Sequence, residues 1–197
     1  MSREEDLMYT ISYCVTPPQL DTMPVIKTIY HPLANGTGYR PLAYSRCAYV
    51  EGHGMLIDLQ AFERKPSDCG LTPPHGSCIA AAFCFGGAVL CAVANAAGRC
   101  SIYLDGELQS TITLQTHCYS GEDEQGWYWG VRFYLANEVL ATASMTQLAV
   151  GSIIKADFYK FRLDAERAYI ASVCPMAADV DLLCPTEALA DFTLVAY

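Results

Sequence analysis

Residues 78–94, CIAAAFCFGGAVLCAVA, are apolar at nearly every position, and this run constrains the fold more than any other feature. A strand that is apolar throughout has both of its faces covered, whereas a half-exposed strand alternates apolar and polar residues. Gly86-Gly87 interrupts the run, so a long helix is excluded and a tight hairpin is favoured. The run therefore predicts two central strands of a sheet that is covered on both sides.

The rest of the chain repeats this strand-like pattern. Sustained helical periodicity is nearly absent, and short apolar or alternating runs recur between turn signals such as Asp105-Gly106. One helical turn is predicted over Asn137–Ala143, with Asn137 as its cap. We expect one all-β domain over residues 1–197: a two-sheet antiparallel, jelly-roll-like β-sandwich with one or two short helical turns, and residues 1–40 as an extended lead-in. The predicted strands are Leu42–Val50, Met55–Phe62, Ser77–Phe85, Ala88–Ala94, Cys100–Leu104, Glu107–Cys118, Trp127–Tyr134, Ser152–Arg162, Tyr169–Val173 and Phe192–Tyr197.

The charge balance and the N-terminus exclude several classes of partner. The 12 Lys and Arg residues against 21 Asp and Glu residues give a net charge of −9, which repels a phosphate backbone, so we expect no nucleic-acid partner. The N-terminal segment lacks the basic and apolar regions of a secretory signal. No stretch reaches the roughly 18 apolar residues of a membrane span, so we expect a cytoplasmic protein with no membrane partner.

The ten cysteines do not form a recognisable metal or disulfide pattern. No CxxC pair occurs, and zinc sites usually bring two such close pairs. The cysteines fall singly inside apolar runs, where cysteine behaves as a small buried hydrophobe. We expect reduced thiols, no metal site and no cofactor.

The stretch GWYWGVRFY, residues 126–134, holds both tryptophans of the chain. Alternate strand residues share a face, so Trp127 and Trp129 lie with Val131, Phe133 and Leu135, an apolar set that predicts a core position for both tryptophans. The opposite face carries Tyr128, Arg132 and Tyr134. Flat rings beside a guanidinium are suited to hydroxyl-rich or carboxylate-bearing ligands, although an ordinary polar outer face is the interpretation favoured by default.

The strand within GSIIKADFYKFRL, residues 151–163, also has two different faces. Ile154, Ala156 and Phe158 form an apolar face, and the opposite face is mixed. If this strand and the tryptophan strand belong to one sheet, their mixed faces form a common surface. A cross-strand ion pair between Arg132 and Asp157 is the alternative that needs no ligand. The predicted ligand-binding residues are Tyr128, Arg132, Lys155, Asp157 and Tyr159.

Three segments of the chain are CAVANAAGRCSIYLDG (91–106), GWYWGVRFYLANEVL (126–140) and GSIIKADFYKFRLD (151–164). In order and spacing they resemble the carbohydrate-binding module family 9-like domains, over roughly residues 40–197. The resemblance implies a β-sandwich that binds saccharides. The family has asparagine before the Phe-Tyr pair where this chain has Asp157, and proline in the tryptophan strand where this chain has Ala136. The matching residues are Asn95 and Gly98 of an N-x-x-G motif, Trp127 with Leu140, Phe158-Tyr159-Lys160, and Asp181 with Pro185.

The sequence shows no catalytic or calcium-binding motif. GxSxG, P-loop, HExxH and GxGxxG patterns are absent. Glycoside hydrolysis needs two carboxylates across one bond, and the sequence brings no two of Asp58, Asp157 and Glu138 together. The three consecutive carboxylates in GEDEQG, residues 121–126, point in divergent directions and indicate a solvated hairpin tip.

The function expected first is therefore a non-catalytic β-sandwich that binds a saccharide or a saccharide-like ligand. The alternative is an intracellular protein-interaction or homodimeric scaffold domain that has lost sugar binding. Hydrophobic residues make up 52% of the chain and charged residues 17%, which favours some apolar surface shared with a partner. A sugar-active hydrolase is a third hypothesis, and it requires a buried carboxylate pair.

Overall fold

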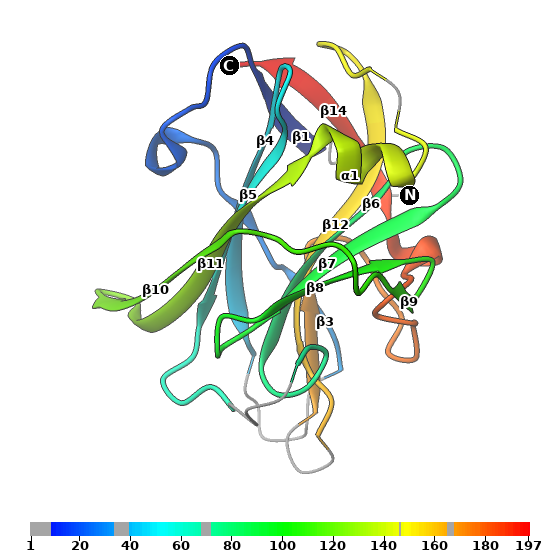
Figure 1. The fold of residues 1–197 in the computed structure, drawn as a ribbon. Helices are drawn as coiled ribbons and strands as arrows, with labels where there is room; N and C mark the ends of the chain where they lie inside the picture. Colours follow the sequence, from blue (N-terminus) through cyan, green and yellow to red (C-terminus); the bar gives the residue numbers. More distant parts are fainter. Residues whose placement is uncertain (1–8, 34–39, 68–71, 146, 165–167) are drawn as a thin grey trace, which may run out of the picture.

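The computed structural model describes residues 9–33, 40–67, 72–145, 147–164 and 168–197, and they form a β-sandwich with one short α-helix (Figure 1). The expected all-β fold is confirmed, because nearly every regular element is a strand. The strands are β1 (Tyr9–Cys14), β2 (Ile26–Lys27), β3 (Tyr30–Leu33), β4 (Leu42–Val50), β5 (Gly54–Phe62), β6 (Cys78–Cys84), β7 (Val89–Asn95), β8 (Cys100–Leu104), β9 (Glu107–Leu108), β10 (Thr116–Asp123), β11 (Gly126–Ala136), β12 (Ile153–Arg162), β13 (Tyr169–Ser172) and β14 (Ala190–Ala196). The helix α1 is Asn137–Thr142, and the 3-10 turns η1 and η2 are Leu20–Thr22 and Thr186–Ala188.

The strands of the described residues form one continuous 14-stranded sheet that folds over into two layers. Its hydrogen-bonded order is β10-β11-β5-β4-β1-β14-β12-β6-β7-β8-β9. Figure 1 shows β10, β11 and β5 on one side of the molecule and β12, β6, β7 and β8 on the other. Strand β1 is parallel to both of its neighbours, β4 and β14, so the sheet is not purely antiparallel as expected.

The main core lies between the two layers. The odd residues of β5 and β11, such as Ile57 and Val131, meet Ala81 and Phe83 of β6 and Phe158 of β12 there. Side chains on these faces alternate with outward-facing ones, as the period of a strand requires.

The run 78–94 has a second core on its other face, as its apolar pattern predicts. Ala80 and Ala82 are fully buried there against Leu182 and Leu189 of the C-terminal segment. Burial on both faces explains why this run carries so few polar residues.

Residues 9–33 contribute strands to the sheet rather than a simple lead-in. Strand β1 pairs with β4 and β14, and its Ile11 is buried in the main core. Leu20 of η1 and Met23 pack on Ala48 and Leu56 at the outer face of β4 and β5. The N-terminal segment therefore both joins the two layers and covers part of one of them.

Two local predictions around the β8–β9 turn have different outcomes. Asp105 and Gly106 have φ values of 49° and 82°, which confirms the tight hairpin turn. The predicted strand Glu107–Cys118 is wrong, because β9 ends at Leu108 and β10 begins at Thr116. Backbone bonds from Gln109 N to Ile102 O and from Ile112 N to Gln109 O turn the intervening residues away from a strand ladder.

The helix is confirmed, but its cap is wrong. Ala136 is the N-cap residue, without a side-chain cap bond, and Asn137 is the first helical residue. Leu140 and Ala143 are buried, which confirms the expected apolar face. No helix in the described part of the chain is long and apolar enough to cross a membrane.

The cysteines within the described residues are all free thiols, and Cys69 lies outside those residues. Cys14, Cys47, Cys78, Cys91 and Cys174 are buried, whereas Cys118 is exposed. Burial raises the pKa of Cys91 to about 12, so this thiol stays protonated and unreactive at neutral pH.

Candidate functional site

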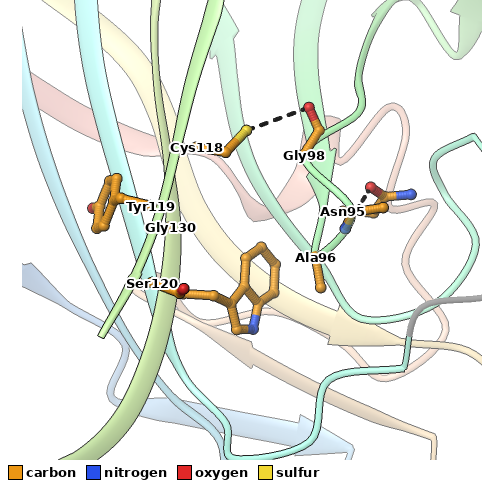
Figure 2. Close-up of a pocket in the computed structure, with 9 residues that line it drawn as sticks. Asn95, Ala96, Gly98, Cys118, Tyr119, Ser120 and Gly130 are labelled. Atoms are coloured by element: carbon orange, nitrogen blue, oxygen red, sulfur yellow. Dashed lines mark hydrogen bonds between the residues drawn. The ribbon is translucent and has the colours of Figure 1, made fainter. Parts of the chain in front are cut away.

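A pocket of about 260 Å³ lies between the inner face of the β10–β11 hairpin and the turn that joins β7 to β8 (Figure 2). The hairpin extends as one wall, and the β7–β8 turn forms the opposite wall. The pocket is lined by Asn95, Ala96, Ala97, Gly98, Cys118, Tyr119, Ser120, Trp129 and Gly130.

The N-x-x-G motif shapes the β7–β8 wall. The side-chain oxygen of Asn95 accepts hydrogen bonds from Ala97 N and Arg99 N, each at 3.1 Å, so one amide holds the whole turn. Gly98 has a φ of +78°, and a Cβ at this position would lie 2.4 Å from the sulfur of Cys118. The glycine therefore allows both the left-handed turn and the close approach of β10.

Cys118 contacts this turn from the hairpin side. Its Sγ donates a weak hydrogen bond to Gly98 O at 3.5 Å, and Figure 2 shows the thiol directed at the turn. Tyr119, the next residue, points away on the opposite side of β10. The alternation of β10 thus gives the pocket Cys118 and Ser120 as side-chain contributors.

Trp129 belongs to both the pocket and the core. Its side chain is 6% exposed and packs in the main core, as the alternation of β11 predicts. Its indole Nε1 is buried and has no hydrogen-bond partner among the described residues. An unsatisfied buried donor costs about 1 to 3 kcal/mol, so this N–H is the pocket lining's least satisfied group.

A buried ion pair supports the ring of Trp129 from behind. Lys160 Nζ lies 5.4 Å from the centroid of the Trp129 ring and donates to Glu63 Oε2 at 2.6 Å and to Tyr169 Oη at 2.7 Å. Burial lowers the pKa of Lys160, and the Glu63 carboxylate opposes that shift. The Phe158-Tyr159-Lys160 match therefore ends in a buried cation that contacts the ring of the pocket-lining Trp129.

Trp127 is not in the core, contrary to the prediction. It shares a face with Trp129 but is 46% exposed. It is the second residue of β11, and Glu122, which faces it across the hairpin, is exposed too. Among the described residues, none buries the Trp127 side chain, so its indole is open to solvent two residues from Trp129.

The common surface predicted for five ligand-binding residues does not form. Tyr128 and Arg132 lie half-buried on the outer face of β11. Strands β11 and β12 belong to one continuous sheet, but β5, β4, β1 and β14 separate them, and the sheet folds between them. Lys155 lies on β12 in the other layer, where it pairs with Asp191 at 3.0 Å on the surface.

Asp157 and Tyr159 are buried and anchor the C-terminal segment. Asp157 Oδ1 accepts hydrogen bonds from the backbone N–H groups of Phe158, Val173 and Cys174. Tyr159 Oη donates to Leu182 O at 2.5 Å. In this structure neither side chain reaches solvent, so the prediction that both contact a ligand is wrong, and both are structural anchors. The alternative prediction of an Arg132–Asp157 ion pair is wrong as well.

Burial also changes the acidity of Asp157. Desolvation raises its pKa to about 7, although the three backbone hydrogen bonds favour the charged form. Its second oxygen, Oδ2, has no partner among the described residues. Burial therefore favours the protonated form of Asp157.

The described residues that line the pocket are all neutral. The carboxylates nominated for hydrolysis lie on three different elements. Asp58 lies on the outer face of β5, Asp157 on β12, and Glu138 is exposed on α1. At the hairpin tip, Glu122, Asp123 and Glu124 are exposed, and the described residues contain no group of three potential metal ligands.

Sequence reasoning found part of this pocket through the N-x-x-G motif and missed the rest. Cys118 and Ser120 were missed, because the predicted strand Glu107–Cys118 ends at Cys118, whereas β10 runs from Thr116 to Asp123. The exposure of Trp127 also left no trace in the alternation, since a strand that outruns its opposing layer keeps the same period.

Comparison with solved structures finds the same fold at low sequence identity. A candidate carbohydrate-binding protein from Bacteroides uniformis superposes with a TM-score of 0.64 at 16% identity, over 95% of this chain and 98% of that one. A carbohydrate binding module of family 9 from Caldicellulosiruptor kristjanssonii, solved with cellotriose, gives a TM-score of 0.64 at 8% identity, over 96% and 94% of the two chains. A family 9 module from the same organism, solved with glucose, gives 0.61 at 10% identity, over 96% of each chain.

These likenesses confirm the β-sandwich fold that the sequence resemblance implied. No protein-family model matches the sequence, and no curated protein matches it significantly.

Proposed function

We propose that this protein is a non-catalytic carbohydrate-binding β-sandwich, and that the sugar binds in the pocket between the β10–β11 hairpin and the β7–β8 turn. The observation that carries the proposal is the open indole of Trp127, 46% exposed, two residues from the pocket-lining Trp129 on the same strand face. The C–H face of a sugar ring packs on an aromatic ring, and a site needs few polar groups besides.

The remaining pocket groups complement a hydroxyl-rich ligand. Ser120 is exposed and brings a hydroxyl group to the pocket lining, and Ala97 and Gly98 bring backbone groups. The volume of about 260 Å³ lies just below the range of roughly 300 to 1,000 Å³ that is typical of small-molecule sites. We therefore propose that the pocket takes one end of a short oligosaccharide rather than the middle of a polymer.

The neutral lining supports binding without catalysis. A glycosidase holds two carboxyl groups about 5 to 10 Å apart across the scissile bond, and none of the described lining residues is acidic. The fold likeness supports the ligand class, since two of the similar structures hold cellotriose and glucose.

Calorimetric titration with cellotriose and glucose tests the proposal. We expect saturable binding by the wild type and a loss of about tenfold or more in affinity for Trp127→Ala, since the open indole supplies the stacking face. Trp127 is half exposed, so the melting temperature should change little.

Tyr134→Ala is the matched control, because Tyr134 is an exposed aromatic residue on the opposite face of the same strand. It should bind cellotriose as the wild type does. Equal binding by Trp127→Ala and the wild type would place the sugar elsewhere, and no binding across a broad panel of neutral oligosaccharides would end the proposal.

A homodimer or protein-interaction domain is a second candidate, supported by exposed apolar side chains near the ends of β12 and β14. Ile153 and Val150 are 64% and 55% exposed, and Tyr197 is 57% exposed. Large exposed apolar side chains that gather in one region are typical of interaction surfaces. Light scattering at two protein concentrations distinguishes a dimer from a monomer. Sugar binding in the pocket requires only the monomer.

A further inference from the structure

The outer face of the first layer carries a second group of ligand-competent side chains, away from the pocket. We call it the arginine–tyrosine face and define it by Arg46, Asp58, Tyr119, Tyr128 and Arg132. Strand pairing aligns Arg46 of β4 and Arg132 of β11 on either side of Asp58 of β5. Tyr119 lies on β10 and points away from the pocket (Figure 2). The face and the pocket therefore lie on opposite sides of the same hairpin.

Positive charge exceeds negative charge on this face. Asp58 is 2% exposed and lies 3.5 Å from Arg46 Nη1 and 3.5 Å from Arg132 Nε. Two guanidinium groups share one carboxylate, so the three residues keep a net charge of +1. Lys27 of β2 pairs with Tyr44 of β4 at the same face and adds another cation. The chain as a whole carries −9, so the net charge of these residues is opposite in sign to that of the molecule.

Asp58 does not use up the hydrogen-bonding capacity of the two arginines. Charge-assisted N–H···O bonds measure about 2.7 to 2.9 Å, and both contacts here are longer. The Nε atoms of Arg46 and Arg132 are buried and have no hydrogen-bond partner among the described residues, so Asp58 leaves both guanidinium groups incompletely satisfied. Tyr119 Oη donates a hydrogen bond to Asp58 Oδ1 at 2.8 Å and so uses part of the accepting capacity of this carboxylate. The Arg132 side chain is 37% exposed, so part of its guanidinium group is open to solvent, and a guanidinium group fits a planar carboxylate.

Aromatic rings lie beside these cations. Tyr128 packs against Phe62 with ring centroids 5.9 Å apart and against Tyr119 at 6.3 Å. Gly130 makes room for the Tyr119 ring, since a Cβ there would lie 2.4 Å from Tyr119 Cζ. The result is a continuous patch of ring surface next to two guanidinium groups.

We propose that the arginine–tyrosine face is a second binding site, and that its ligand is a saccharide bearing a carboxylate, such as a uronic-acid oligomer. The guanidinium groups bind the carboxylate and the tyrosine rings pack on the sugar ring. Positive charge distinguishes this site from the neutral pocket, so one molecule binds a neutral sugar end and an acidic sugar unit on two sides of the β10–β11 hairpin.

Calorimetric titration with trigalacturonate at low and at physiological salt tests this site. We expect Arg132→Gln to weaken binding by about tenfold or more and Asp58→Asn to strengthen it, because the substitution removes the carboxylate that competes with the ligand for both arginines. Lys155→Gln removes an equal charge from an exposed residue in the other layer, where Lys155 pairs with Asp191. This control should bind trigalacturonate as the wild type does. Melting temperatures of all variants identify any that fail to fold, and Tyr128→Ala then replaces a misfolded variant.

Several outcomes would overturn the proposal. The wild type could fail to bind trigalacturonate, or Arg132→Gln and Lys155→Gln could weaken its binding equally. A folded Asp58→Asn variant could also keep the affinity of the wild type. Equal binding of a glutamate tripeptide would show that the face selects carboxylates without a sugar. Cellotriose should not displace trigalacturonate, and Trp127→Ala should leave trigalacturonate binding intact, so failure of the pocket and failure of this face give different results.

Discussion

At the scale of single residues, Asp157 links the packing of the C-terminal segment to pH. Its carboxylate holds the backbone of Val173 and Cys174 from a fully buried position. Burial raises the folded-state pKa from 3.8 to about 7, so the folded state keeps a proton that the unfolded chain has already lost. The stability contributed by this group is therefore present below about pH 4 and decreases as pH rises toward 7.

Asp157→Asn should remove this pH dependence. An asparagine keeps an oxygen that accepts the same backbone hydrogen bonds, and it carries no charge to desolvate. We expect a higher melting temperature than the wild type at pH 8 and a flatter profile between pH 5 and pH 8, measured by circular dichroism. Asp191→Asn, at an exposed position, is the control and should keep the slope of the wild type. A slope unchanged in Asp157→Asn would show that another group titrates.

The alternation of side chains along a strand predicted the burial of some single residues and not of others. The period of β11 correctly placed Trp129 in the core and Tyr128 on the outer face. It misplaced Trp127, because exposure there depends on where the opposing layer ends. Tyr159 was misplaced for the opposite reason: its face looks mixed in the sequence, but a segment more than twenty residues later covers it, with Leu182 O as its partner.

At the scale of elements, β1 decides how the two layers are joined. It lies between β4 and β14, and its parallel pairing with both makes one sheet from what alternation alone predicts as two. Parallel pairs leave no hairpin signal in the sequence, since their partners lie far apart along the chain. The hairpins β6–β7 and β8–β9, which are local, were predicted from Gly86-Gly87 and Asp105-Gly106.

Substitutions in β1 test whether this strand is integral to the fold. Ile11 is 1% exposed in the main core, so Ile11→Ala should lower the free energy of unfolding by about 2 to 5 kcal/mol. Thr10→Ala changes an exposed neighbour on the same strand and should alter it by less than about 0.5 kcal/mol. Urea unfolding gives both values. Similar values for the two variants would mean that β1 is a dispensable lead-in.

At the scale of the whole molecule, the fold was more predictable than the site. Strand periodicity and turn residues define an all-β sandwich, because burial of alternate faces leaves a local pattern. The candidate pocket brings together Asn95, Ser120 and Trp129 from three separate strands, and the arginine–tyrosine face depends on the register of β4, β5 and β11. Pairing of this kind is a long-range property that local patterns do not encode.

The central claim is that a sugar binds against the tryptophans of β11, and the chain has only two of them. Each indole N–H gives one cross-peak in a two-dimensional ¹⁵N–¹H NMR spectrum, and Trp127→Phe assigns the pair by removing one. On titration with cellotriose, both indole peaks should shift along a single saturating curve, because Trp127 and the pocket-lining Trp129 lie on the same face of β11. Backbone peaks that move with cellotriose while both indole peaks stay fixed, or a spectrum that does not change at all, would contradict the account.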